Sequence, residues 1–200
     1  MTVIGITGPT GAGKTTVLNV LENMGGAVAD CDAVYHELLL TSQPMQNELK
    51  IRFGTSVFDE NVHLRRKALG AIVFEDADAL NDLNAITHRY ITAELTRMIA
   101  QAKTDGRPAI ALDAIALLES GAGDLCAVTV AVTAPEEVRV RRIMEREGIS
   151  KEYARARVTA QKPSSWFEER CTYTLRNDGS REALEAKARA LFELILYQGG

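Results

Sequence analysis

The chain has 200 residues, with 23 lysines and arginines against 27 aspartates and glutamates, giving a net charge of −4. This balance argues against a protein that coats nucleic acid or an anionic membrane. Hydrophobic residues make up 46% of the chain, which predicts a folded core, and no apolar run is long enough for a membrane span. The three cysteines, Cys31, Cys126 and Cys171, are scattered and odd in number. We therefore expect a reducing, cytoplasmic environment, and we expect no signal peptide.

Short apolar runs alternate with amphipathic segments, a pattern typical of an α/β fold with a parallel sheet flanked by helices. Length favours a single domain over residues 1–200. The predicted strands are 3–6, 27–29, 109–112, 128–132 and 172–175. The predicted helices are 14–24, 33–40, 43–53, 65–74, 77–103 and 181–197.

Two segments are unusual for such a fold. Nearly eighty residues separate the second and third predicted strands, which is long for a crossover and indicates a helical insertion that could cover a substrate. The segment after the fourth strand, residues 135–161, is rich in arginine.

Residues 8–15 read Gly-Pro-Thr-Gly-Ala-Gly-Lys-Thr and match the full phosphate-loop pattern between a predicted strand and a predicted helix. Glycines let backbone amides approach phosphate oxygens, and the helix N-terminus adds further N–H groups. Lys14 can reach the β- and γ-phosphates of ATP, and the Thr15 hydroxyl can bind Mg²⁺.

An acidic pair, Asp30 and Asp32, follows the second predicted strand. If the strand continues, both carboxylates share one face and Cys31 points to the other. One Asp could then accept a proton from a hydroxyl that attacks the γ-phosphate. The alternative is that Asp32 only caps the helix predicted over 33–40.

Arg142 and Arg146 are four residues apart and so share one helix face. They could close over ATP and neutralise the charge on the transferred phosphoryl group. The alternative is a solvated basic face paired with neighbouring glutamates.

Four more residues are candidates for binding Mg²⁺ or acceptor phosphates, and each could instead have a purely structural role. Asp113 follows the third strand, as a carboxylate near Mg²⁺ would, or it caps the next turn. Arg65 and Arg66 oppose the dipole at a helix start, which suits acceptor phosphates or a plain surface. His88 binds the same phosphates or is a half-buried histidine.

A series of motifs runs from residue 5 to about residue 180. It comprises the phosphate loop, Asp30 with Asp32, residues 64–69 with 72–74, His88, Asp113, residues 117–121, residues 134–138, Arg142 with Met144 and Arg146, residues 154–157 with Gln161, and Asn177 with Gly179. Together, in this order and spacing, the motifs resemble the dephospho-CoA kinase family.

The resemblance implies ATP-dependent phosphorylation of the ribose 3′-hydroxyl of dephospho-CoA, the last step of coenzyme A synthesis, with Mg²⁺. It implies a P-loop kinase fold with core segments 1–35, 105–135 and 170–200, a helical acceptor-side insertion at about 43–104 and a helical lid at about 136–168. We expect a monomer or weak homo-oligomer.

The resemblance also implies roles for single residues. The catalytic residues would be Asp32 as general base, Lys14 and Arg142. ATP would bind Gly8, Gly11, Ala12, Gly13, Lys14, Thr15, Thr16, Arg142, Arg146 and Asn177. The acceptor would bind Asp32, His36, Arg65, Arg66 and His88. Mg²⁺ would bind Thr15 and Asp113.

The chain departs from the family pattern at several positions. His36 stands where an arginine is usual, Arg89 follows His88 where a proline is usual, and Arg139 stands where a glutamine is common. Two other functions stay open: a kinase of a nucleoside monophosphate or another small hydroxyl metabolite, and a nucleotide-dependent switch that signals by shape change.

Overall fold

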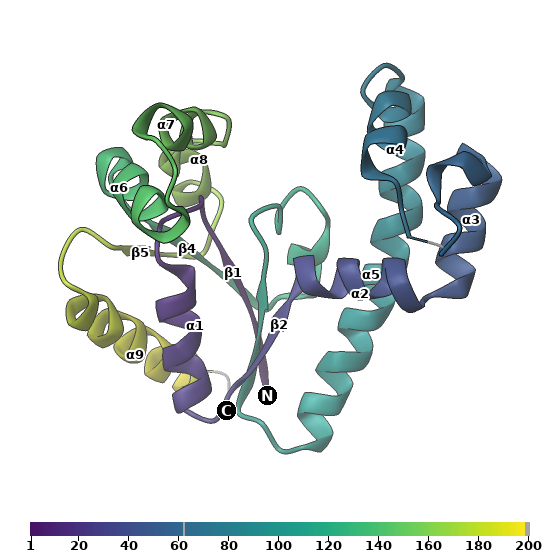
Figure 1. Cartoon of the computed structure of the whole chain (residues 1–200). Coiled ribbons are helices and arrows are strands. Elements are labelled where there is room, and N and C mark those ends of the chain that lie inside the picture. The colour runs from purple at the N-terminus through teal and green to yellow at the C-terminus, as the bar shows by residue number, and fades with distance from the viewer. Residues whose placement is uncertain (62, 199–200) are drawn as a thin grey trace. The chain divides into compact units, whose positions relative to one another are not determined.

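The computed structural model describes residues 1–61 and 63–198 (Figure 1). Contacts divide the chain into two compact units. The first unit comprises Met1–Ala29 and Ile99–Gly200, and the second comprises Asp30–Met98. The phosphate loop therefore belongs to the first unit, whereas Asp32 belongs to the second.

A five-stranded parallel sheet has the order β2-β3-β1-β4-β5. Its strands are β1 (Thr2–Thr7), β2 (Ala27–Asp30), β3 (Ala109–Asp113), β4 (Val128–Thr133) and β5 (Tyr173–Arg176). The central strand β1 pairs in parallel with β3 on one side and with β4 on the other. All five predicted strands are confirmed, with ends that differ by no more than one residue. The carboxyl ends of parallel strands share one edge, so the segments that follow β1, β3, β4 and β5 lie at the same edge.

The first unit also contains helices α1 (Lys14–Asn23), η2 (Ala122–Leu125), α6 (Glu136–Glu147), α7 (Lys151–Thr159), α8 (Ser164–Glu168) and α9 (Arg181–Gln198). Helices α1 and α9 pack side by side in Figure 1 and share one hydrophobic core with the sheet. Leu184, Ala188, Phe192 and Ile195 recur at helical spacing and are buried. This packing fixes α1, and with it the end of the phosphate loop, against the sheet.

Helices α6 and α7 form a pair with a small core of their own. Val140 and Ile143 of α6 pack with Ala154 and Val158 of α7. Gly148 caps the C-terminus of α6, and its left-handed backbone (φ 66°) lets the chain turn back toward α7. The arginine-rich segment therefore forms two helices that pack against each other, and this packing determines where its arginines lie.

The second unit contains α2 (Cys31–Thr41), α3 (Gln43–Phe53), η1 (Thr55–Val57), α4 (Arg66–Val73) and most of α5 (Ala77–Thr104). The helices predicted over this region are confirmed. Their apolar faces bury Leu39, Met45, Leu49 and Phe53 in a separate hydrophobic cluster. The unit is therefore a helical body with its own core.

Across residues 1–61 and 63–198, no helix combines the length and the apolar character needed to cross a membrane. None of the three cysteines, all of them within the described residues, forms a disulfide.

Candidate functional site

The phosphate loop connects β1 to α1, as the sequence predicts. Gly8 has φ 137°, and a Cβ there would overlap the carbonyl oxygen of Val132. Gly13 has φ 107°, and a Cβ there would overlap the side-chain amide nitrogen of Asn177. Only glycine fits these two positions, because both the backbone angle and the neighbouring atoms exclude a side chain.

Helix α1 starts directly after the loop. Gly13 is its N-cap residue, no described side chain caps it, and its first turn contains no acidic residue. An uncapped helix N-terminus of this kind favours a bound anion.

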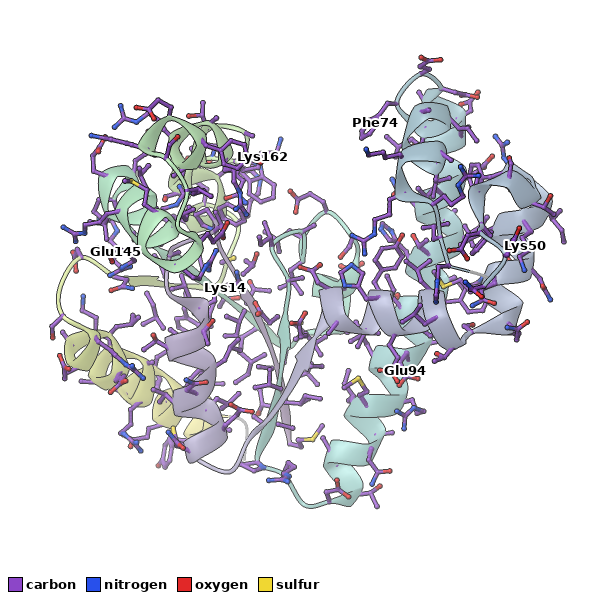
Figure 2. All side chains as sticks on the ribbon, viewed as in Figure 1. Lys14, Lys50, Phe74, Glu94, Glu145 and Lys162 are labelled. Carbon is purple, nitrogen blue, oxygen red and sulfur yellow. The ribbon has the colours of Figure 1, made fainter. Side chains whose placement is uncertain are left out.

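Lys14, the first residue of α1, is labelled in Figure 2. Its Nζ lies 3.5 Å from the carbonyl oxygen of Gly8 and 3.9 Å from Oδ1 of Asp113. Its side chain is only 15% exposed, so the ammonium group is held close to the loop. Asp113 is the last residue of β3, at the sheet edge from which the loop departs.

Three side chains donate hydrogen bonds to the loop carbonyls of residues 10–12. Arg139 Nε donates to Thr10 O at 2.9 Å, Arg142 Nη1 donates to Gly11 O at 3.3 Å, and Asn177 Nδ2 donates to Ala12 O at 2.8 Å. In a trans peptide the N–H points away from the preceding C=O. The amides of residues 11–13 therefore face away from these three donors.

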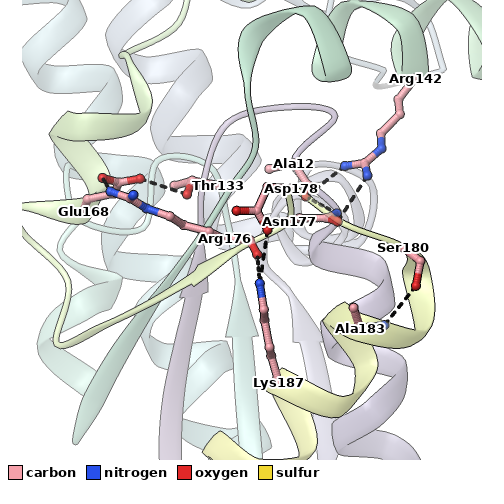
Figure 3. Close-up of polar contacts among 10 residues, drawn as sticks. All are labelled: Ala12, Thr133, Arg142, Glu168, Arg176, Asn177, Asp178, Ser180, Ala183 and Lys187. Atoms are coloured by element: carbon pink, nitrogen blue, oxygen red, sulfur yellow. Dashed lines mark hydrogen bonds and ion pairs between the residues drawn. The ribbon is translucent and has the colours of Figure 1, made fainter.

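Asn177 occupies the centre of this arrangement (Figure 3). It directly follows β5 and is 4% exposed. Its backbone N–H donates to Thr133 O at 2.7 Å, and its side-chain Oδ1 accepts a hydrogen bond from Arg142 Nη2 at 3.1 Å. One amide side chain thus links the phosphate loop to Arg142 and to the end of β4.

The hollow over the loop has a volume of about 160 Å³. Residues 9–15 line it together with Arg142 and Arg146. The structure thus brings both predicted arginines to the phosphate loop. Burial lowers the pKa of Arg142, and the positive charge of Arg141 lowers it further. A guanidinium stays charged despite such shifts, so the hollow is cationic.

The alternative for Arg142 and Arg146 was a solvent-exposed basic helix face paired with glutamates. Arg146 fits that alternative and Arg142 does not. Arg146 is 59% exposed and pairs with Glu147, as that alternative predicts. Arg142 instead directs its guanidinium to the loop and to Asn177.

The sequence motifs give no role to Arg139, which is 3% exposed and contacts the loop. Its spacing could have indicated a role, because Arg142 and Arg146 follow Arg139 by three and seven residues and the three arginines therefore lie along one helix face.

The expectation that Asp30 and Asp32 point to one face of a continuing strand was wrong. The strand ends at Asp30 and helix α2 begins at Cys31, so the two carboxylates do not share a strand face. Asp30 is also the helix cap, because its Oδ1 accepts hydrogen bonds from the N–H groups of Asp32 at 2.9 Å and Ala33 at 3.0 Å. Asp32 therefore does not cap the helix and lies exposed in its first turn.

The acceptor candidates all lie in the second unit. His36 is exposed on α2, and its ring centroid lies 5.8 Å from that of Tyr35. Burial raises the pKa of Tyr35, and the positive charge of Arg66 opposes that rise. Thus Tyr35 has His36 and Arg66 as neighbours.

Arg65 and His88 take other positions. Arg65 precedes α4 and donates to Ser56 O at 3.4 Å, and His88 is half-buried on α5. The neighbouring Arg89 is exposed and pairs with Glu48 of α3.

Thr15 is exposed in the first turn of α1 and offers a hydroxyl oxygen, and Asp113 offers a carboxylate. Both are oxygen donors of the kind that Mg²⁺ prefers. Among the described residues, no group of three or more His, Cys, Asp or Glu side chains could hold a metal ion.

The fold and the phosphate loop define an α/β protein of the P-loop kinase class. The dephospho-CoA kinase family model matches residues 2–183. A dephospho-CoA kinase of Corynebacterium diphtheriae is 36% identical over 198 residues and covers 99% of each chain. The chain therefore belongs to the dephospho-CoA kinase family.

Solved structures agree with this assignment of the fold. TT1252 from Thermus thermophilus superposes with a TM-score of 0.77 at 35% identity, over 100% of this chain and 98% of that chain. A dephospho-CoA kinase from Campylobacter jejuni gives a TM-score of 0.70 at 21% identity, over 99% of this chain and 98% of that one. The predicted α/β, P-loop kinase fold is confirmed.

Replacing Gly13 with alanine is expected to weaken Mg·ATP binding at least about tenfold, because the new Cβ displaces Asn177 from the loop. Isothermal titration with Mg·ATP measures the change. Gly106→Ala is the matched control, since Gly106 also has a positive φ (69°) but a Cβ there meets no atom within 4 Å. Equal ATP affinity in the two variants would contradict the role of this contact.

Proposed function

We propose that the chain transfers the γ-phosphoryl group of ATP to the ribose 3′-hydroxyl of dephospho-CoA, giving coenzyme A. Membership of the dephospho-CoA kinase family supports this activity, because the family model matches residues 2–183. The observation that carries the proposal is the phosphate loop, because its carbonyls are held by Arg139, Arg142 and Asn177 while a cationic hollow opens over it. Such a loop suits a nucleoside triphosphate.

ATP binds with its phosphates on Gly8 and on residues 11–16, and Lys14 contacts the β- and γ-phosphates. Arg142 and Arg146 face the same hollow and neutralise the charge that spreads over the transferred phosphoryl group. Asn177 holds the loop and Arg142 in register for this step. Transfer needs no covalent intermediate, so these residues act through position and charge.

Thr15 and Asp113 would hold Mg²⁺. The fit rests on their oxygen donors and on Lys14, which precedes Thr15 and lies 3.9 Å from Asp113. When bound, Mg²⁺ neutralises charge on the phosphates.

Asp32 acts as the general base that takes the proton from the attacking hydroxyl. Its place in the chain supports the role. It comes two residues after the end of β2, a strand of the sheet that carries the phosphate loop after β1. Its carboxylate is exposed, and Asp30 caps the helix in its stead.

The acceptor phosphates bind His36, Arg65, Arg66 and His88, which supply cationic and hydrogen-bonding groups. The helical insertion at about 43–104 holds the acceptor, and the segment at about 136–168 is a lid that excludes water. Water exclusion favours transfer over ATP hydrolysis. We place this small-molecule enzyme in the cytoplasm.

A coupled assay with ATP and a panel of hydroxyl acceptors tests the function. We expect dephospho-CoA to be phosphorylated with the highest kcat/KM and coenzyme A to be the product, identified by mass. Higher kcat/KM for adenosine monophosphate would overturn the acceptor assignment. ATP binding without transfer to any acceptor would support a switch.

Replacing Asp32 with asparagine is expected to lower kcat about 10³-fold, because the acceptor hydroxyl loses its base. The KM for ATP should change little, since Asp32 does not contribute to the phosphate loop. Steady-state kinetics measure both values. Asp30→Asn is the matched control, because asparagine also caps helices and should keep most of the activity. Comparable kcat values for both variants would exclude Asp32 as the base.

Replacing His36 with arginine is expected to lower the KM for dephospho-CoA several-fold at pH 8, about the effect of one added charge-assisted hydrogen bond to phosphate. His63→Arg, at an exposed histidine paired with Asp59, is the control. A KM for dephospho-CoA that stays at the wild-type value in His36→Arg would show that position 36 does not contact the acceptor.

A further inference from the structure

Arg139 of α6 is a buried cation that makes no ion pair within the described part of the chain, and the negative charge of Glu136, in the first turn of the same helix, only partly opposes the drop that burial causes in the pKa of Arg139. Arg139 is 3% exposed, and no ion pair among the described residues includes it. Its guanidinium donates to two neutral oxygens, Thr10 O at 2.9 Å and Gln161 Oε1 at 3.2 Å. A buried charge is costly unless a charge of opposite sign compensates it.

Gln161, which follows α7, completes a clamp on Thr10. Its Oε1 accepts the backbone N–H of Thr10 at 2.9 Å, while Arg139 donates to the carbonyl of the same residue. Both backbone polar groups of Thr10 are thereby fixed by side chains from the α6–α7 pair. We call Arg139 and Gln161 the Thr10 clamp.

The backbone of α6 also approaches the loop closely. A Cβ at Gly11 would lie 2.9 Å from the carbonyl oxygen of Arg139. The guanidinium of Arg139 also lies at the loop, within hydrogen-bond distance of the Thr10 carbonyl. Phosphates bound at the loop would then supply the further negative charge that Glu136 alone does not provide.

We propose that Arg139 and Gln161 are positioning residues for ATP: the clamp keeps the Thr10 peptide turned so that the following amide faces the phosphates, and the buried charge of Arg139 takes the triphosphate as its counter-ion. The inference rests on the proposed function in taking ATP as the nucleotide. Neither side chain touches the substrate, and both act through the loop.

Two variants separate charge from hydrogen bonding. Arg139→Gln removes the charge and keeps an amide donor for Thr10 O. Gln161→Glu keeps an acceptor for Thr10 N–H and for Arg139 but compensates the buried charge. Arg189→Gln is the control, since Arg189 is exposed on α9 and loses the same charge.

Isothermal titration with Mg·ATP, without acceptor, measures the effect. We expect about a tenfold rise in Kd for both clamp variants, the size expected when one partly screened charge near the phosphates is lost or neutralised. The control should stay within about twofold of the wild type, because its charge is solvent-screened. The KM for ATP should follow Kd, while kcat at saturating ATP stays within about threefold, since the reacting groups are unchanged.

Wild-type Mg·ATP affinity in both clamp variants would overturn the proposal, even if their melting temperatures fell, because Arg139 would then be purely structural. If Arg139→Gln fails to fold, the titration of Gln161→Glu alone tests the proposal, since a glutamate at 161 can still accept the hydrogen bonds from Thr10 N–H and Arg139. The titration contains no acceptor, so phosphorylation of a different acceptor would refute the proposed function and leave this test intact.

Discussion

The site depends on one constraint: three consecutive backbone carbonyls of the phosphate loop are held by side chains that come from other elements. Arg139 and Arg142 come from α6, and Asn177 comes from the segment after β5. Each bond turns a peptide so that its N–H faces away from the donor. The glycines permit this conformation, but tertiary contacts select it, so the shape of the loop is a property of the whole first unit.

The same contacts connect nucleotide binding to the arginine-rich helices. Asn177 holds both Ala12 and Arg142, and its backbone is bonded to the end of β4, from which α6 departs. Near that point Glu168 of α8 accepts hydrogen bonds from Thr133 and Arg176 (Figure 3). The beginning and the end of the α6–α8 segment are therefore both attached to the sheet next to the loop, where a movement of these helices would be transmitted to the phosphates.

The sequence was sufficient for the strands, most helices and the phosphate loop, because period-two and 3.6-residue patterns and a strict motif encode them locally. It failed where neighbouring residues compete for one role. Either aspartate of the pair at 30 and 32 can cap a helix, and only the backbone geometry assigns the cap to Asp30. It also overlooked Arg139, because a charged residue in a helix is normally read as solvent-facing and its burial depends on the distant Thr10 and Gln161.

We propose that the enzyme transfers a phosphoryl group from a loop-bound triphosphate to an acceptor that Asp32 activates. A crystal structure with dephospho-CoA, Mg²⁺ and a non-hydrolysable ATP analogue would test this. We expect the γ-phosphate on the amides of the loop and an Asp32 carboxylate oxygen within hydrogen-bond distance, about 3 Å, of the ribose 3′-oxygen. An Asp32 side chain that faces away from that oxygen, with both ligands in place, would contradict it.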